Sequence, residues 1–401
     1  MRRIEYPNDM DALKQDFLLI FNDSLSEMQE EWANLRVQLR ALENNTPESH
    51  QMFPNEIKSL LVADYDFLVD VFIYYLKMVE KHGERMNGLH ERLTNLFNYS
   101  TAGSTFPKFQ PDISSFFMKH QQNLNLYVCY YCELSYINSY GFTSVYKDIG
   151  QFLKGATRHQ IERYVRRGDG KKLSERKYDR IMRLQKEPGV NASNIEEHFN
   201  NLDVRWRRAV KKSNRVKEML RNHFDLDHFL PKSKCPLVAL SLMNFVPCCS
   251  VCNEKLKGDD ILWGENKTTR KDVLMKISPI SHRYDLDANA KIKLNDHDHG
   301  WLRAQDHPDD YSLEFKSSDP DYQSEVIDEF HLDERYACHK CEALRWHDLM
   351  NDYPPSRIHE MAEALNDYKT EAQLRNDIFQ MDFFDNNVRC FDKLRRDILG
   401  I

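Results

Sequence analysis

The sequence predicts a mainly helical protein, α+β overall, that contains a small metal-linked core. Three observations predict this class. The 401 residues include only 13 Gly and 14 Pro, apolar residues recur at helical spacing towards both ends, and two Cys-x-x-Cys pairs lie far apart in the sequence. With 41% hydrophobic residues the chain can bury two or three cores, and 30% charged residues indicate a soluble protein.

Residues 1–105 are expected to form an N-terminal helical region. A seam of apolar residues, spaced alternately by four and three, comprises Met28, Trp32, Leu35, Leu39 and Leu42. This spacing is typical of helix-on-helix packing. After the helix-breaking run NNTPESHQMFPNE, a second helix is expected from about Pro54 to Lys81. We interpret these helices as an internal core, with a homo-oligomer or docking surface as the alternative.

The most apolar stretch, LLVADYDFLVDVFIYYLKMV, is interrupted by Asp64, Asp66 and Asp70. It is therefore predicted to be a buried helix and not a membrane span. The first residues lack the apolar segment of a secretory signal. Nine cysteines, an odd number, favour a reducing compartment, so we expect a cytoplasmic protein with no membrane partner.

Four short motifs carry the chemistry. In order they are CYYC at 129–132, DHFLPKS at 227–233, Asn244, and CSVCN at 249–253. Two Cys-x-x-Cys pairs can supply the four thiolates of a tetrahedral zinc site. The spacing from the second motif to the fourth suits a β-hairpin that leads into a short helix.

The proposed zinc ligands are Cys129, Cys132, Cys249 and Cys252. Cys248 lies next to Cys249, and the sequence alone allows either to pair with Cys252. The two-residue gap of a zinc knuckle favours Cys249, which leaves Cys248 as a buried neighbour. The alternative is that these thiols are ordinary core cysteines.

This ordered set resembles the HNH, or ββα-metal, nucleases, which share the knuckles, the Asp-His-x-x-Pro-x-Ser run and the Asn. The resemblance places the core at 222–262, with the first knuckle in 106–144. It implies that His228 is the general base that activates water. It also implies that Asp227 and the side-chain oxygen of Asn253 are ligands of a catalytic Mg²⁺ or Mn²⁺ ion.

Further residue roles follow from the same resemblance. Asn244 is expected to be a support residue that bridges backbone groups of the hairpin and holds His228 in place. Lys255 and Lys257, on the closing helix, are expected to meet phosphate.

Residues 145–221 separate the first knuckle from the DHFLPKS motif and are predicted to be a helical insertion. They hold 21 Lys or Arg against 10 Asp or Glu, although the whole chain has a net charge of −7. This concentration of positive charge indicates contact with a phosphate backbone, with Arg205, Arg207 and Arg208 as candidate nucleic-acid-binding residues. The alternatives are solvated helix faces or docking to an acidic partner.

The remainder is expected to form a mixed cap at 263–330, with strands at KIKLND and YSLEFKS, and a helical region at 331–401. The FHLDERYACHK run resembles the tail of HNH nucleases in bacterial antiphage modules such as the Septu type, which implies a partner ATPase. Cys338 and Cys341 form a third Cys-x-x-Cys that lacks a second pair. The NDHDHG run, 295–300, is interpreted as a solvated loop.

The sequence therefore predicts a divalent-metal-dependent HNH endonuclease that acts on DNA, as the effector of an antiphage system. An RNA endonuclease acting on tRNA remains an alternative, because the phosphate backbones of RNA and of DNA both attract positively charged side chains. Another is a non-catalytic, zinc-containing nucleic-acid-binding subunit. The presence of Asp227, His228 and Asn253 argues against that second alternative.

Overall fold

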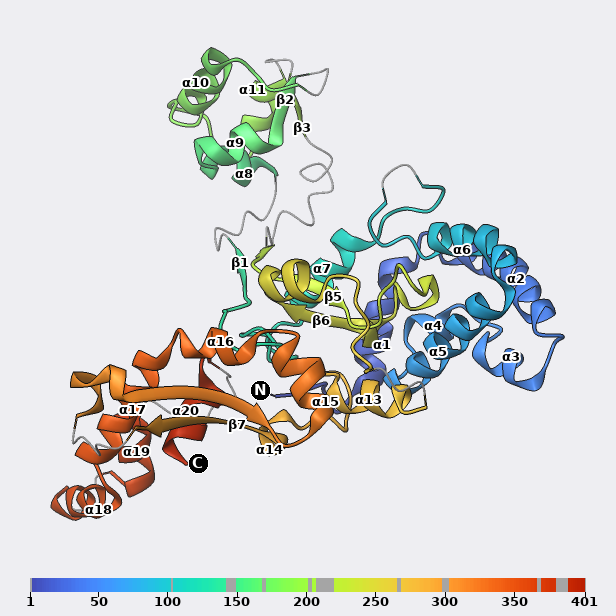
Figure 1. Cartoon of the computed structure of the whole chain (residues 1–401). Helices are drawn as coiled ribbons and strands as arrows, with labels where there is room; N and C mark the ends of the chain where they lie inside the picture. The colour runs from blue at the N-terminus through green and yellow to red at the C-terminus, as the bar shows by residue number, and fades with distance from the viewer. Residues whose placement is uncertain are drawn as a thin grey trace. The chain divides into compact units, whose positions relative to one another are not determined.

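The computed structural model describes ten stretches of the chain: residues 2–101, 104–141, 149–167, 171–200, 204–206, 220–264, 268–297, 303–365, 369–379 and 389–400. These stretches are mainly helical, with strands in two-stranded sheets (Figure 1). The chain divides into two compact units. Unit 1 comprises Met1–Asn138 and Asn222–Ile401, and unit 2 comprises Ser139–Arg221. Among the described residues, no helix is long and apolar enough to cross a membrane.

The first part of unit 1 is helical. Its elements are α1 (Met10–Leu18), η1 (Leu19–Phe21), α2 (Leu25–Leu42), α3 (Pro47–Met52), α4 (Lys58–Leu61), α5 (Tyr65–His82), α6 (Glu84–Leu96) and α7 (Gln110–Lys119). Helix α2 packs against α6 and α3, and its seam residues Met28, Trp32 and Leu35 are fully buried. The seam therefore belongs to an internal core.

One helix boundary differs from the expectation. A single helix from about Pro54 to Lys81 was predicted, but α4 and α5 are separate helices with a break between Leu61 and Tyr65. Asp64 adopts an extended backbone conformation at the start of α5, with φ −72° and ψ 153°. Its carboxylate pairs with Lys14, 2.7 Å away, so a contact distant in sequence accompanies the break.

The hairpin that carries the DHFLPKS motif lies in unit 1. Strand β5 (Asp225–His228) pairs antiparallel with β6 (Phe245–Cys248), which places Asp227 opposite Val246 and His228 opposite Phe245. The connection contains η3 (Pro236–Val238) and η4 (Leu242–Asn244), and β6 leads into η5 (Val251–Lys257). Helix α5 packs against η3 and η4, so the most apolar helix supports this hairpin.

The last part of unit 1 combines a sheet with helices. Its elements are α13 (Arg270–Ile277), α14 (Leu286–Asn289), β7 (Ala290–Asp296), η6 (Ala304–Asp306), η7 (Pro308–Asp310), β8 (Tyr311–Ser317), α15 (Pro320–Tyr322), η8 (Gln323–Asp328), α16 (Leu332–Ala337), α17 (Lys340–Asp352), α18 (Pro355–Ala364), α19 (Glu371–Phe379) and α20 (Asp392–Leu399). The runs KIKLND and YSLEFKS lie in β7 and β8, which pair antiparallel. Helix α16 packs on β8 and α20 on β7.

Unit 2 has its own elements and its own core. They are β1 (Ser139–Gly141), α8 (Ile149–Gly155), α9 (Arg158–Tyr164), β2 (Val165–Arg167), α10 (Glu175–Leu184), α11 (Ile195–Asn200), β3 (Val204–Trp206) and β4 (Leu220–Asn222), which extends one residue into unit 1. Arg205 lies in β3, opposite Arg166 of β2. Arg207 and Arg208 lie outside the described residues.

The α2 seam allows a direct test of the internal core. Leu35→Ala removes a fully buried side chain and should lower the free energy of unfolding by about 2–5 kcal/mol, because a cavity remains. Val37 lies on the same helix with a 59% exposed side chain, so Val37→Ala should change stability by less than about 0.5 kcal/mol. Urea unfolding followed by circular dichroism gives both values. Equal effects would place the seam at the surface.

Candidate functional site

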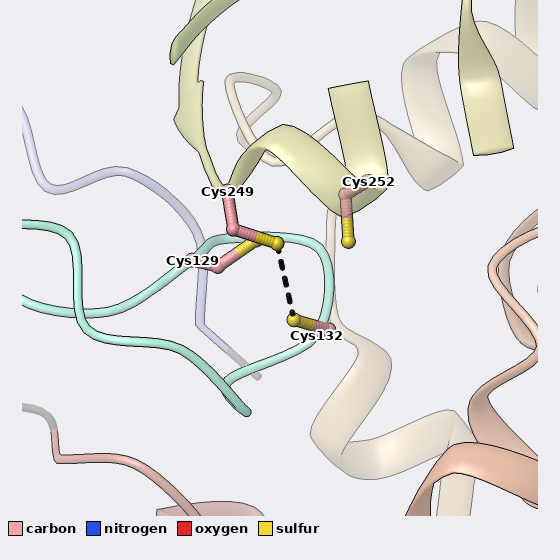
Figure 2. A group of neighbouring side chains, drawn as sticks. All are labelled: Cys129, Cys132, Cys249 and Cys252. Atoms are coloured by element: carbon pink, nitrogen blue, oxygen red, sulfur yellow. Dashed lines mark hydrogen bonds between the residues drawn. The ribbon is translucent and has the colours of Figure 1, made fainter. Parts of the chain in front are cut away.

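Four cysteine side chains converge in unit 1. Cys129 and Cys132 come from a loop before the insertion, Cys249 directly follows β6, and Cys252 lies in the first turn of η5 (Figure 2). All four are buried, and their sulfur atoms lie within 4.8 Å of one another. Among the described residues, this is the one group of three or more potential His, Cys, Asp or Glu ligands that lie this close together.

The sulfur geometry suits a zinc ion. A tetrahedral site with Zn–S bonds of about 2.3 Å places its sulfurs about 3.8 Å apart. The Sγ atoms of Cys132 and Cys249 lie 4.0 Å apart. Hydrogen bonds from the other three cysteines lower the pKa of Cys249, whereas burial raises the pKa of Cys129. The cluster can therefore hold one structural zinc ion.

Backbone and side-chain donors surround the sulfurs. The N–H of Leu134 donates to Cys132 Sγ at 3.4 Å, and Arg335 Nη1 donates to Cys252 Sγ at the same distance. Arg335 also donates to the carbonyl of Phe330 at 3.1 Å, which orients its guanidinium group. Such outer contacts stabilise thiolate ligands. Cys248 is buried beside the cluster but is not one of its four members.

Tyr131, between the two cysteines of the first knuckle, connects the thiol cluster to the hairpin. Its hydroxyl donates to Asp227 Oδ2 at 2.5 Å, and its ring stacks on Phe330 with centroids 4.6 Å apart. The two partners of the hydrogen bond are 96 residues apart in the sequence. Tyr131 was not singled out from the sequence, although it lies inside the quoted CYYC motif.

A buried lysine holds the other side of the same carboxylate. Lys257 Nζ donates to Asp227 Oδ1 at 3.1 Å and to the carbonyl of His228 at 3.0 Å. The Lys257 side chain is fully buried. This position differs from the expected phosphate contact, because the ammonium group points into the hairpin and is occupied there. Lys255, by contrast, is exposed.

His228 is buried with one ring nitrogen engaged. Its Nε2 lies 2.9 Å from the carbonyl oxygen of Ala239. A carbonyl only accepts, so Nε2 carries the proton and Nδ1 has the lone pair. Burial, with a smaller contribution from Lys232, depresses the pKa of His228 well below its usual value. Burial thus favours the neutral imidazole, in which Nδ1 is the nitrogen that carries the lone pair.

Asn244 bridges the two ends of the β5–β6 connection. Its Oδ1 accepts from the N–H of Leu230 at 2.8 Å, while its Nδ2 donates to the carbonyls of Leu230 and Val238 at 3.0 and 2.9 Å. The side chain is fully buried, so these bonds satisfy groups that water does not reach. They hold the backbone that follows His228.

One cleft of about 430 Å³ collects the candidate catalytic side chains. Its lining includes Asp227, His228, Asn253, Asp225 and Lys232. The side chain of Asn253 forms a hydrogen bond with the carboxylate of Asp225. Burial nevertheless raises the pKa of Asp225 above its usual value. Asp225 precedes Asp227 by two residues in β5, so both project to one face of the strand. The two-residue spacing from Asp227 is the pattern by which Asp225 could have been predicted from the sequence. Lys232 belongs to the DHFLPKS motif but was not predicted to line the site.

The other candidates are not assembled into a site. Cys338 and Cys341 are both exposed and belong to no cluster of potential metal ligands among the described residues. Of the NDHDHG run, residues 298–300 lie outside the described residues.

Comparison of the chain with family models, with curated proteins and with solved structures gave no match. The site must therefore be interpreted from its own geometry.

The thiol cluster predicts one zinc ion per chain. Cys129→Ser should lower the zinc content well below one per chain and reduce the melting temperature, because zinc binding contributes to folding. Cys338→Ser replaces an exposed thiol outside the cluster and should leave both unchanged. Metal analysis of the purified proteins provides the measurement. A zinc-free wild-type protein, or a Cys129→Ser variant with full zinc content, would contradict the assignment.

The bridging role of Asn244 predicts a large stability loss. Asn244→Ala leaves three buried backbone groups without this partner and should cost about 2–5 kcal/mol in unfolding free energy. Asn87 is exposed on α6, so Asn87→Ala should stay within about 0.5 kcal/mol of the parent. Chemical denaturation measures both. Similar stabilities for the two variants would show that the bridge contributes little.

Proposed function

We propose that this chain is a divalent-metal-dependent endonuclease of the HNH type, which hydrolyses phosphodiester bonds of DNA. In this proposal β5, β6 and η5 form the ββα-metal core, and the four cysteines bind a structural zinc ion. The observation that carries the proposal is the shared cleft of Asp227, His228 and Asn253. One potential base and two potential oxygen ligands are thus gathered in one cleft.

His228 is suited to act as the general base. Its neutral imidazole donates through Nε2 to Ala239, which fixes the ring and leaves Nδ1 to take a proton from water. The ring also packs against Tyr99 and Phe245, with centroids 4.6 and 4.9 Å away. A ring fixed in this way loses little conformational entropy when it engages water.

The charge of the cleft favours a cation-dependent reaction. Asp225, Asp227, Glu254 and Asp259 line it, and among the described lining residues Lys232 is the one lysine or arginine. Such a lining repels phosphate unless a cation offsets the acids. Asp227 and Asn253 would hold Mg²⁺ or Mn²⁺ through oxygen atoms, the ligands that hard cations prefer. When bound, the ion would stabilise the charge that develops on the phosphate.

Tyr131 and Lys257 act as positioning residues in this proposal. Together they contact both oxygens of the Asp227 carboxylate, which restricts its orientation. Lys257 Nζ lies 3.1 Å from both oxygens and Tyr131 contacts Oδ2, so Oδ1 is the oxygen with a lone pair left for a cation. Lys232 is the cationic side chain that remains at the cleft to meet a substrate phosphate.

The antiphage setting and a partner ATPase rest on the resemblance of the FHLDERYACHK run alone. Two residues of that run support the zinc site in unit 1. Arg335 donates to Cys252, and Tyr336 donates to the carbonyl of Cys132 at 2.8 Å. The run therefore has a structural use that is independent of any partner.

The proposal predicts that His228→Ala abolishes metal-dependent cleavage, with a loss of at least about 100-fold. Zinc content and DNA affinity should stay near those of the parent, because the base contributes little to phosphate-dominated binding. Asp227→Ala and Asn253→Ala should instead raise the Mg²⁺ concentration needed for cleavage. Rates are measured on plasmid DNA with Mg²⁺ or Mn²⁺.

His282→Ala, which removes a largely exposed imidazole, is the matched control and should cleave normally. Substantial Mg²⁺-dependent cleavage by a folded His228→Ala protein would remove this residue from the base role. Single-stranded DNA and tRNA, assayed in parallel, separate the DNA proposal from the RNA alternative. Cleavage of tRNA without cleavage of DNA would favour the latter.

A further inference from the structure

Unit 2 buries its apolar side chains within itself. Its core consists of Phe152, Leu153, Ala156, Ile161, Val165, Leu173, Tyr178, Ile181, Val190, Ile195 and Phe199. Helix α10 contributes Tyr178 and Ile181 to this core, and Gln185, just after the helix, donates to the carbonyls of Leu153 and Ala156 at 2.6 and 3.0 Å. One face of α10 is thereby fixed inward, and the opposite face is directed to solvent.

Three arginines occupy the outward face of α10. Arg176, Arg180 and Arg183 are exposed and recur at steps of four and three, which places them in one stripe. At 1.5 Å of rise per residue the stripe is about 10 Å long. At about 100° per residue it lies opposite Tyr178 and Ile181, so the helix is basic on one side and buried on the other.

The acidic residues nearest the stripe share one other arginine as their partner. Arg158, on α9, pairs with Glu162 at 2.7 Å and also with Glu175 and Asp179 of α10. Within the described part of the chain, no hydrogen bond or ion pair involves the side chains of Arg176, Arg180 and Arg183. The helix therefore presents three guanidinium groups that have no carboxylate partner among the described residues.

We infer that the outward face of α10, defined by Arg176, Arg180 and Arg183, binds the phosphate backbone of duplex DNA. Among the aromatic residues of unit 2 whose burial is described, Phe152, Tyr178 and Phe199 are buried and offer no ring for base stacking, so a duplex and not a single strand is the inferred partner. B-form DNA has a major groove about 12 Å wide that admits an α-helix, while the major groove of A-form RNA is deep and narrow.

This inference adds a DNA contact outside the proposed cleavage site and does not depend on that chemistry. The test uses full-length protein carrying His228→Ala, so that binding is measured without cleavage. Arg176→Glu/Arg180→Glu/Arg183→Glu should weaken binding to a 20-base-pair DNA duplex by at least tenfold at low salt. The slope of log affinity against log salt should fall by about two to three, close to one for each lost phosphate contact.

The control reverses three exposed cations in unit 1, Lys58→Glu/Lys77→Glu/Arg85→Glu, for the same change in net charge. It should lower affinity by much less and leave the salt slope unchanged. The milder Arg176→Gln/Arg180→Gln/Arg183→Gln protein controls for misfolding of the Glu variant. It should also lower the slope of log affinity against log salt. Fluorescence anisotropy gives both quantities. The inference would be overturned if both α10 variants bound DNA as tightly as the parent, or if they lost no more affinity than the control variant. Tighter binding of an RNA duplex than of the DNA duplex would also overturn it.

Discussion

The convergence of four buried thiols is the constraint on which the rest of unit 1 depends. It joins a loop at 129–132 to the segment 249–252, although unit 2 lies between them in the sequence. Bringing such distant segments together costs entropy, but the cost grows only logarithmically with the length of the intervening chain. Unit 2 has its own buried core, so it can occupy this interval without contributing side chains to the cluster.

The same cluster orders the proposed catalytic cleft through specific contacts. Tyr131 lies between two of the cysteines and donates to Asp227, while η5 carries both Cys252 and the buried Lys257 that pairs with Asp227. A rearrangement of the thiol cluster, such as loss of a bound zinc ion, would therefore reach the Asp227 carboxylate from two directions. The thiol cluster and the proposed catalytic cleft form one packed assembly.

Local features were accessible from the sequence. The two Cys-x-x-Cys spacings, the hairpin and the α2 seam depend on periodicity and ligand chemistry, and each has a counterpart in the structure. The contacts of Tyr131 and Arg335 were not accessible, because each depends on a partner far away in the chain. The direction of Lys257 was missed for the same reason, because a buried contact with Asp227 fixes it. The break before α5 was also missed, and a Lys14–Asp64 ion pair accompanies it.

The central claim is that four sulfur atoms from the two distant segments bind one zinc ion. X-ray absorption spectroscopy at the zinc edge, on the purified full-length protein, tests it most directly. The account predicts a first shell of four sulfur scatterers at about 2.3 Å. A shell dominated by nitrogen or oxygen, or a protein that purifies without zinc, would contradict it.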